Sequence, residues 1–540
     1  MTMRLTKQSL EIIVVVVLLL VIGMSATIVP FITLPKDRVF AGFHGYSSDY
    51  IQYVSYIKEG MYGRYYMDFR SFPPDQPATP IHWLYIFSGI LFGPFGLSAP
   101  VIYHIVRVIL GSLLIYSVYR IFLELFRAHQ LALFSTMIAF VSSCVGWISQ
   151  TGGIWSVRIL NYFPFYISTP QRVADRPHYL LGSVLFLVVM YLVLRAKFNP
   201  YTILVLCFVS FVTVIVHTAS GVVLALLSLA MIGIHLIQRK ISDHKVYTAW
   251  FGFSIGFGCG LGALVTYYYV QQYSLVSNIF IDQYAYSSPR NLANLLHEAI
   301  SFGPLLWIGL PGLFIGLFKS SSINIYKRAV LFAWGVIHVL LFMVLYPLFH
   351  VDQVRFVQSL YYIPLTYGTI WLLWAISKRF SRLIFYGGVA LVIVVSLPTY
   401  FSHAYTDLFA MTDYRTYATF GFPTKNQFAA YQFLDRNSPK ESTVLAFYEA
   451  ANMLLIYSHN RVLGNDQGWS PDGGQTMKQG VANWFSGKES DSDAYNFLTI
   501  NNVSYVYYGY QERWLGDITK YPFLKKVYEN PEAIVYRFER

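Results

Sequence analysis

The apolar stretch IHWLYIFSGILFGPFGL, residues 81–97, decides how the chain crosses a membrane. A spanning helix needs about 20 predominantly apolar residues, so the stretch is nearly long enough. It also contains His82, Pro94 and several glycines, which favour a short interfacial or re-entrant helix. If the stretch crosses, the chain has about twelve spans and both termini are cytoplasmic. If it lies along the outer surface, there are about eleven spans and the C-terminal region is outside.

The composition of the whole chain places it in a membrane. Of its 540 residues, 55% are hydrophobic and 12% are charged, whereas soluble domains carry about 25% charged residues. The mean hydropathy is +0.47. Apolar runs long enough to cross the bilayer recur along the chain, which excludes a soluble fold. The runs are 10–31, 81–97, 100–125, 131–149, 178–196, 200–216, 219–238, 247–270, 302–318, 327–348, 356–376 and 381–401.

Basic residues in the short loops decide between the two topologies. Lys and Arg are enriched in cytoplasmic loops, and the twelve loop cations named below would all be outside if residues 81–97 crossed. We therefore expect that they do not cross. The cations then placed in the cytoplasm are Arg127, Arg195, Lys197, Arg239, Lys240, Lys245, Lys319, Lys327, Arg328, Lys378, Arg379 and Arg382. The net charge of +12 includes no dense basic block, so no nucleic-acid partner is expected.

The N-terminus predicts a retained signal anchor. Arg4 and Lys7 precede an apolar run from about Ile12 to Ile28, which is longer than the apolar core of about 7–15 residues in a cleaved signal peptide. We therefore expect a multi-pass protein of the plasma (inner) membrane with a cytoplasmic N-terminus and an extracytoplasmic C-terminal domain.

The long segments between the spans fall on the outer side in this topology. Residues 1–401 are predicted to form a helical transmembrane domain with outer loops at 32–99, 150–177 and 271–301. Residues 402–540 alternate helix and strand signals, which predicts a soluble α/β domain outside the membrane. Loops longer than about 12–15 residues usually have a function or are disordered, so the outer face is the expected functional face.

Asp49 is the first candidate functional residue. It lies in FHGYSSDYIQYVSYIKEG, shortly after the first span, and Tyr50, Val54 and Ile57 follow it at helical spacing. An amphipathic helix at the interface would hold this carboxylate at a fixed height above the bilayer. The alternative is a solvated acid or a helix cap.

The end of the second outer loop is the second candidate region. In STPQRVADRPHYLLGS, Arg172, Asp175, Arg176 and His178 come directly before the fourth span. Pro177 suits the first turn of that helix, so Asp175 could instead serve as its N-cap. Arg176 and His178 could contact substrate or anchor the interface.

These residue types suit a polyprenyl-phosphate sugar as substrate. The guanidinium fork of an arginine matches phosphate oxygens, and a carboxylate can take the proton from an attacking hydroxyl. Arg355 lies beside Asp352 at the start of the tenth span, where it could bind such a phosphate or form a plain ion pair with that acid. Tyr50 and Arg64 of the first loop are further expected substrate-binding residues.

The layout of the first loop resembles the glycosyltransferase C superfamily, whose members include protein O-mannosyltransferases and the aminoarabinose transferases of lipid A. The resemblance implies an essential acidic residue at Asp49, a second functional acid at Asp175 and a phosphate-binding arginine at Arg355. Several families of this type carry paired acids where this chain has Ser47-Ser48-Asp49. A divalent metal would want more than one carboxylate, so no metal or other cofactor is expected.

The expected function is therefore that of an enzyme. It would transfer a hexose or pentose from a polyprenyl-phosphate donor to a lipid, glycan or protein acceptor on the outer face. A transporter or flippase of a lipid-linked intermediate is the alternative from another class. Transporters tend to have inverted repeats and charged residues at mid-membrane, whereas the charges here lie at the outer mouth of the bundle. A catalytically inactive scaffold of the same fold is a further alternative.

Overall fold

The structure of the chain is a computed structural model, and its contacts divide it into two compact units. The helical unit comprises Met1–Ser25, Arg107–Gln272 and Phe280–Thr406, and the mixed unit comprises Ala26–Val106, Tyr273–Ile279 and Asp407–Arg540. The residues that the structure describes are 6–43, 47–66, 70, 82–142, 146–151, 154–159, 169–195, 199–238, 247–272, 303–319, 323–345, 360–405, 421–464 and 475–540.

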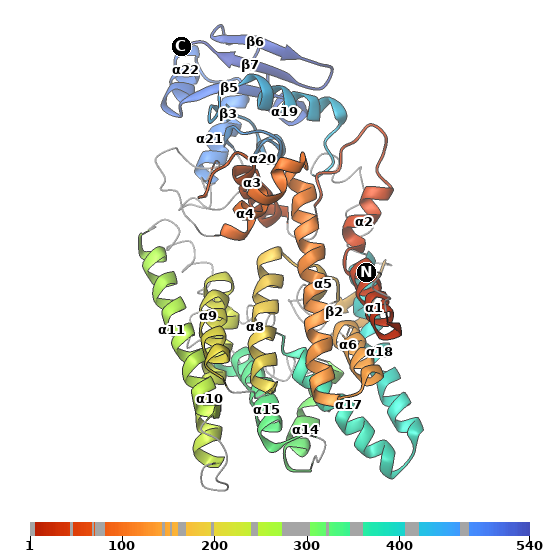
Figure 1. The fold of residues 1–540 in the computed structure, drawn as a ribbon. Helices are drawn as coiled ribbons and strands as arrows, with labels where there is room; N and C mark the ends of the chain where they lie inside the picture. The colour runs from red at the N-terminus through yellow and green to blue at the C-terminus, as the bar shows by residue number, and fades with distance from the viewer. Residues whose placement is uncertain are drawn as a thin grey trace. The chain divides into compact units, whose positions relative to one another are not determined.

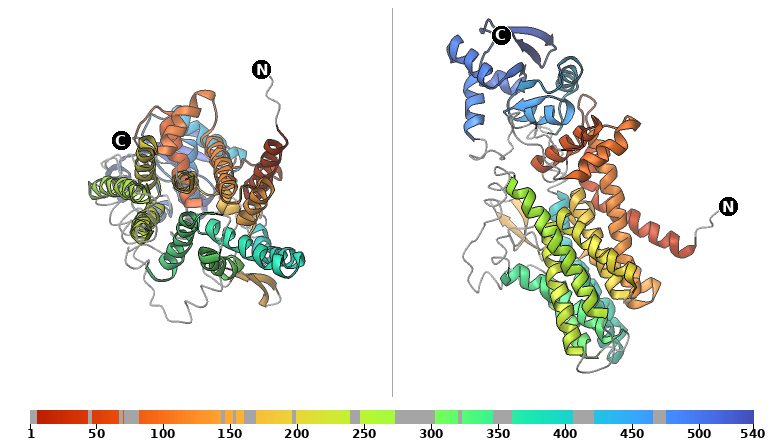
Figure 2. Two further views of the ribbon diagram at one scale, coloured as in Figure 1. Left: turned by 60° about the horizontal axis from the view of Figure 1, so that its bottom comes forward. Right: turned by 60° about the vertical axis from the view of Figure 1, so that its left-hand side comes forward.

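The helical unit is built from apolar helices and one short hairpin (Figure 1). Its elements are α1 (Lys7–Gly23), most of α5 (Ala99–Phe126), α6 (His129–Val141), β1 (Gly146–Thr151), β2 (Ile154–Ile159), α7 (Thr169–Ala174), α8 (Pro177–Arg195), α9 (Pro200–Val216), α10 (Thr218–Gln238), α11 (Tyr247–Gln272), α14 (Pro304–Lys319), α15 (Ile325–Leu340), η3 (Leu341–Leu345), α17 (Tyr362–Arg379) and α18 (Arg382–Tyr405). In Figure 2, α8, α9, α10 and α11 run side by side.

The long helices make the chain a multi-pass membrane protein. Within the described residues, α5, α8, α10, α11 and α18 contain the five helical segments that are long and apolar enough to cross a bilayer. A sixth is added if α1 and α2 (Ser25–Ile32) form one broken span. A helix suits the bilayer core because it satisfies its backbone hydrogen bonds internally. The number of about eleven spans stays a prediction.

Glycines let two helices of this unit approach closely. A Cβ added to Gly309 of α14 would lie 2.3 Å from the carbonyl oxygen of Leu365 in α17, and one added to Gly312 would lie 2.1 Å from that of Gly368. Small residues of this kind bring backbones together in membrane helix pairs, where van der Waals packing drives association.

The mixed unit begins with all but the first residue of α2 and continues into the first loop. The helices of that loop are α3 (Ser47–Met61) and α4 (Trp83–Phe92), followed by the 3₁₀ turn η1 (Gly93–Phe95). The ten-residue α4 is about 15 Å long, half the thickness of the hydrocarbon core. This length favours the predicted short interfacial helix within residues 81–97. The side of the membrane stays a prediction.

The helices α3 and α4 cross at two glycines. A Cβ on Gly60 would lie 1.9 Å from the carbonyl oxygen of Ile86, and one on Gly89 would lie 2.0 Å from that of Ile57. No larger side chain fits at either position without moving a backbone. The crossing therefore fixes how α4 lies on the helix that carries Asp49.

The end of the chain forms an α/β domain within the mixed unit. Its strands pair in the order β4-β3-β5-β7-β6, with β3 parallel to β4 and β5, and with β7 antiparallel to β5 and β6. The elements are α19 (Lys425–Asn437), β3 (Thr443–Leu445), α20 (Tyr448–Tyr457), β4 (Arg461–Leu463), α21 (Gln475–Phe485), α22 (Asp491–Ile500), β5 (Val503–Tyr508), α23 (Tyr510–Leu515), β6 (Leu524–Glu529) and β7 (Ile534–Phe538).

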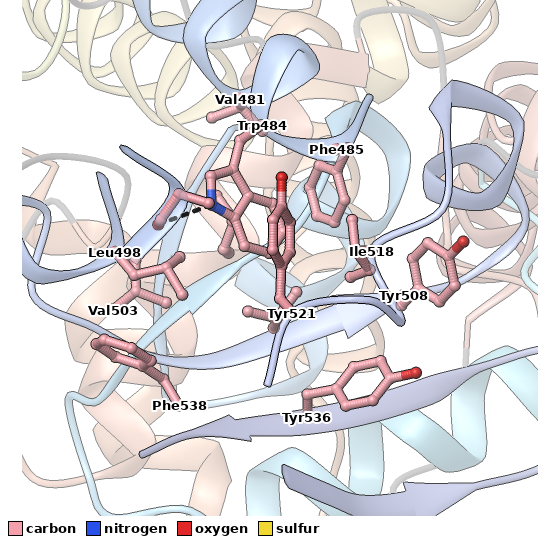
Figure 3. Close-up of a cluster of buried hydrophobic side chains, with 13 residues drawn as sticks. Val481, Trp484, Phe485, Leu498, Val503, Tyr508, Ile518, Tyr521, Tyr536 and Phe538 are labelled. Atoms are coloured by element: carbon pink, nitrogen blue, oxygen red, sulfur yellow. Dashed lines mark hydrogen bonds between the residues drawn. The ribbon is translucent and has the colours of Figure 1, made fainter. Parts of the chain in front are cut away.

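A hydrophobic core fills the space between this sheet and α21 (Figure 3). Trp484 and Phe485 of α21 are fully buried there with Val503 of β5, and Phe538 of β7 joins them. The indole of Trp484 donates a hydrogen bond to the carbonyl oxygen of Ala494 at 3.1 Å, so its polar atom is satisfied inside the core.

The first loop is tied to the α/β domain by backbone pairing. Val39 N donates to Pro423 O and Ala41 N donates to Gly421 O, both at 2.9 Å. Arg38 adds a side-chain hydrogen bond from Nη1 to Phe422 O at 3.0 Å. These contacts explain why residues of the first loop and of the C-terminal region form one compact unit.

Candidate functional site

Asp49 lies in the first turn of α3 and is half-buried. A negative charge is favourable there because the helix N-terminus carries a partial positive charge. The ten residues from Ile51 to Gly60 are all buried, so α3 is held by packing along most of its length. The carboxylate is thus carried by a rigid element rather than by a loop.

Aromatic rings continue the face of α3 that begins with Asp49. Tyr53 and Tyr56 lie four and seven residues after Asp49, a spacing that places all three on one side of a helix. The ring of His82 lies 5.4 Å from that of Tyr53 and stacks on that of Tyr56 at 5.8 Å. Tyr53 also stacks on Tyr85 of α4 at 4.4 Å.

Burial keeps two ring side chains of this face, His82 and Tyr56, uncharged at pH 7. Desolvation lowers the pKa of His82 to about 4, and the nearby Asp49 only partly opposes this shift. Burial raises the pKa of Tyr56 well above its ordinary value, and the charge of Asp49 adds to the rise. His82 and Tyr56 are therefore neutral at pH 7, beside the carboxylate of Asp49.

Tyr50 holds the segment that precedes α3. It is 1% exposed, and its hydroxyl donates to Ala41 O at 2.6 Å. The imidazole Nε2 of His104 lies 2.8 Å from Gly42 O. Gly42 has a φ of +84°, and a Cβ there would lie 2.3 Å from the Tyr50 hydroxyl. The structure thus shows a packing contact for Tyr50, and its binding of substrate stays a prediction.

Ion pairs gather just beyond the other end of α3. Arg64 pairs through Nη1 with Glu59 Oε2 at 2.8 Å and also pairs with Glu441. Arg70 pairs through Nε with Glu59 Oε1 at 2.6 Å. Arg64 is therefore engaged within the protein, and its predicted contact with substrate is untested. The sequence reasoning did not single out Glu59 or Arg70, although an acid at the end of an amphipathic helix with arginines downstream was an available signal.

The second candidate region, in the helical unit, is the turn between α7 and α8. The helix α8 begins at Pro177, so Asp175 lies one residue before the capping position instead of occupying it. Its Oδ1 accepts a hydrogen bond from Arg176 N at 2.7 Å. Arg107 Nε donates to the carbonyl oxygens of Ala174 at 3.0 Å and Asp175 at 3.4 Å. Polar groups here order the turn.

The remaining residues of this turn are buried among aromatic rings. The guanidinium of Arg176 lies 5.1 Å from the ring centroid of Tyr179, and the ring of His178 lies 4.2 Å from it. Arg172 lies 4.3 Å above the ring of Tyr362, and its Nη2 donates to the hydroxyl of Tyr361 at 3.1 Å. Arginine side chains are therefore held on aromatic rings in α7 and just before α8, and their contact with a substrate stays a prediction.

Other predicted residues lie outside the described part of the chain. These include Arg355 with Asp352, so the predicted phosphate ligand has no structural account here. Among the residues that the structure describes, no group of three or more His, Cys, Asp or Glu side chains is arranged to hold a metal ion.

Comparison with known proteins identifies the fold. No family model and no curated protein matches the sequence. Among solved structures, the oligosaccharyltransferase AglB from Archaeoglobus fulgidus, in complex with an inhibitory peptide and a dolichol-phosphate, matches at a TM-score of 0.52 and 12% identity, over 92% of this chain and 69% of its own. ArnT from Cupriavidus metallidurans, bound to undecaprenyl phosphate, matches at 0.52 and 11% identity, over 97% of both chains.

A third match is the arabinofuranosyltransferase AftD from Mycobacteria, at a TM-score of 0.51 and 14% identity. It covers 98% of this chain but only 41% of AftD. AglB, ArnT and AftD are all glycosyltransferases of the C type. The chain therefore has the glycosyltransferase C fold, which confirms the resemblance seen in the sequence. At these identities the similarity establishes the fold alone.

Proposed function

We propose that this protein is a membrane glycosyltransferase. It transfers a sugar from a polyprenyl-phosphate donor to a lipid, glycan or protein acceptor on the outer face of the plasma membrane. The observation that carries the proposal is the half-buried carboxylate of Asp49 at the start of a packed helix, in a chain with the glycosyltransferase C fold.

The proposed reaction is a single inverting displacement. The carboxylate of Asp49 accepts the proton of the acceptor hydroxyl while its oxygen forms a bond to the anomeric carbon. The bond between that carbon and the phosphate oxygen breaks, and the polyprenyl phosphate leaves with the electron pair. Proton transfer to a positioned carboxylate contributes about 10²–10⁴-fold. Burial lowers the pKa of His82 to about 4 and so weakens this imidazole as a base, and the raised pKa of Tyr56 keeps its hydroxyl protonated at pH 7.

Cationic groups are needed where the leaving phosphate gains charge. We propose that Arg176, His178 and Arg355 bind the donor phosphate. Tyr50, whose buried hydroxyl donates to Ala41 O, and Arg64, which pairs with Glu59 near the far end of α3, stay predictions as substrate contacts. For Asp175 we propose an orienting role, because its Oδ1 binds the backbone N–H of Arg176. The lipid class is supported by the lipid phosphates bound to AglB and ArnT.

The test combines donor binding with transfer. The full chain is purified in lipid nanodiscs and mixed with undecaprenyl phosphate, and binding is followed by native mass spectrometry. Transfer is then measured with a radiolabelled polyprenyl-phosphate sugar fraction and a membrane extract as acceptor. We expect one bound lipid phosphate per chain and transfer that Asp49→Asn removes.

The matched control is Asp37→Asn, since Asp37 has a 74% exposed side chain and lies in the same unit. This control should transfer sugar like the wild type. Full activity of Asp49→Asn would overturn the assignment of the base. Movement of labelled lipid across the bilayer without any transfer would replace the proposal with a flippase.

A further inference from the structure

Glu59 is a buried acid near the C-terminal end of α3, the helix whose first turn contains Asp49. Its side chain is 1% exposed and meets two guanidinium groups, those of Arg64 and Arg70. The side chain of Arg70 is also 1% exposed. A carboxylate buried this deeply is stable only with such partners, since removing one leaves an uncompensated charge in a low-dielectric site.

Arg70 links this acid to the α/β domain. Its Nη2 donates to Leu455 O at 2.7 Å, and its Nη1 donates to Ser458 O and to Asn460 O. These carbonyls lie in the last turn of α20 and in the residues after it, where a helix presents unsatisfied acceptors and a partial negative charge. The backbone oxygen of Arg70 also accepts from Val462 N of β4 at 2.8 Å. The arginine thus connects Glu59 to both α20 and β4.

A second set of contacts lies beside the first. Lys58 Nζ pairs with Asp435 Oδ1 of α19 at 3.1 Å, and the hydroxyl of Tyr62 donates to the same oxygen at 3.1 Å. The ring of His459 approaches it at 3.4 Å. Burial lowers the pKa of Lys58 to about 8, and the charge of Asp435 opposes that shift. Two acids from different parts of the chain, Glu59 and Asp435, therefore fasten the end of α3.

Because α3 is a rigid helix, contacts that fix its C-terminal end also restrict the position of its N-terminal end, where Asp49 lies. The fifteen residues of α3 form a rod of about 22 Å, because each residue adds about 1.5 Å. Its start is held by Tyr50 on Ala41, whose segment pairs with residues 421–424. Both attachments lead to the C-terminal part of the mixed unit. The position of Asp49 is thus set by that part as well as by its own loop.

We propose that Glu59 is a positioning residue of the transferase. Its ion pairs with Arg70 and Arg64 lock α3 onto residues 421–540 and thereby hold the Asp49 carboxylate where the acceptor hydroxyl must lose its proton. The α/β domain is in this way a part of the catalytic unit rather than a separate recognition module. This inference rests on the proposed function, because it gives Asp49 the role of base.

The experiment compares Glu59→Gln with Glu441→Gln in the full chain. Both substitutions remove a carboxylate partner of Arg64, but Glu441 has a 50% exposed side chain whereas Glu59 is enclosed. Turnover is measured per bound undecaprenyl phosphate, so that loss of folded protein is not counted as loss of rate. A displacement of about 1 Å at a reacting group costs about 10²-fold in rate. We expect that loss in Glu59→Gln with an unchanged donor Kd, and wild-type turnover in Glu441→Gln.

A second readout does not depend on activity. Hydrogen exchange of the backbone amides of α3 should be at least tenfold faster in Glu59→Gln and unchanged in Glu441→Gln. Glu59→Asp, which keeps the charge on a shorter arm, should recover part of both the turnover and the protection. If Glu59→Gln does not fold, Glu59→Asp and Arg70→Lys are tested instead. Both should lower turnover per bound donor and speed hydrogen exchange in α3.

The outcomes separate the two proposals. A wild-type protein that transfers no sugar but shows the expected exchange pattern would refute the proposed function and leave the anchoring of α3 intact. An active wild type with wild-type turnover and α3 protection in Glu59→Gln would overturn the positioning role. Equal losses of turnover per bound donor in Glu59→Gln and Glu441→Gln would overturn it as well.

Discussion

The start of α3 and the α7–α8 turn each place an acid beside the first turn of a helix, and the two regions use that acid differently. At the turn, Asp175 binds the backbone N–H of Arg176, and Arg107 binds the carbonyl oxygens that end α7. At α3, the surrounding structure is made of aromatic rings, and the charged contacts gather near the far end of the helix.

This difference shows that an acid near the start of a helix can have either of two roles: it can organise a turn, or it can be presented to a substrate. An acid that satisfies backbone groups organises a turn, because the turn would otherwise leave buried amides and carbonyls without partners. An acid in the first turn of a helix that is anchored near its other end is held in place by that anchoring, so it can be presented to a substrate at a fixed position. We therefore expect chemistry at Asp49 and organisation at Asp175.

The largest expected effect distinguishes these two acids directly. Asp49→Asn should lower the turnover of sugar transfer by about 10³-fold, since a general base contributes about 10²–10⁴-fold. Asp175→Asn should lower it by less than about tenfold, since an asparagine keeps the oxygen that accepts the Arg176 N–H. Both are measured as turnover per bound donor. Equal losses would break the comparison and make Asp175 a second catalytic acid.

The next effect tests the packing that supports α3. Gly89→Ala should lower the free energy of unfolding by about 3 kcal/mol, because the new Cβ would meet a backbone oxygen of α3 that cannot move independently. Thermal unfolding in one detergent measures the change. Gly233→Ala is the control, since a Cβ there meets nothing within 4 Å in α10 and should stabilise that helix slightly. An unchanged free energy of unfolding in Gly89→Ala would show that packing against α4 does not stabilise α3.

A smaller effect is expected at the α7–α8 turn. Arg107→Met should cost about 2 kcal/mol of stability, because hydrogen bonds from charged groups contribute about 1.5–3 kcal/mol each. Arg107 is 2% exposed, whereas Arg127 near the end of the same helix is exposed, so Arg127→Met is the control. Donor binding should weaken with Arg107→Met if the turn presents Arg176 and His178. Unchanged thermal midpoints for both variants would contradict a structural role for the turn.

The smallest effect is a pH dependence confined to the mixed unit. Desolvation raises the pKa of Glu512 to about 7 and that of Glu449 to about 7. The folded state therefore keeps protons that the unfolded state has lost above pH of about 4.5. Stability from these acids is fully present below that pH and is lost as the pH rises through about 7.

Thermal unfolding of the full chain between pH 5 and pH 8 measures this dependence. Glu512→Gln should flatten it, and Glu529→Gln, at a side chain that is 52% exposed, should not. Limited proteolysis resolved by region should show the loosening in the α/β domain and in α3, but not at the α7–α8 turn. Loosening at the turn alone would contradict the division into two units.

The amino-acid sequence alone determined the membrane class, the glycosyltransferase C resemblance and the position of Asp49 near a helix start. Apolar run length and helical spacing are local properties, so they can be read without knowing what a helix packs against. The boundary of α8 at Pro177 also followed from local chemistry, whereas the capping position of Asp175 was wrong by one residue. Helix ends are uncertain by that amount whenever the cap geometry is unknown.

Only the tertiary structure decided what holds the candidate base in place. Lys58 and Asp435 are 377 residues apart, and no periodicity in the chain links them. The pairing of Glu59 with Arg70 and the reach of Arg70 to α20 depend on how the first loop packs against the last 120 or so residues. A buried charge is stabilised by partners that are close in space. The order of residues in the sequence does not show which distant residues come together in the fold.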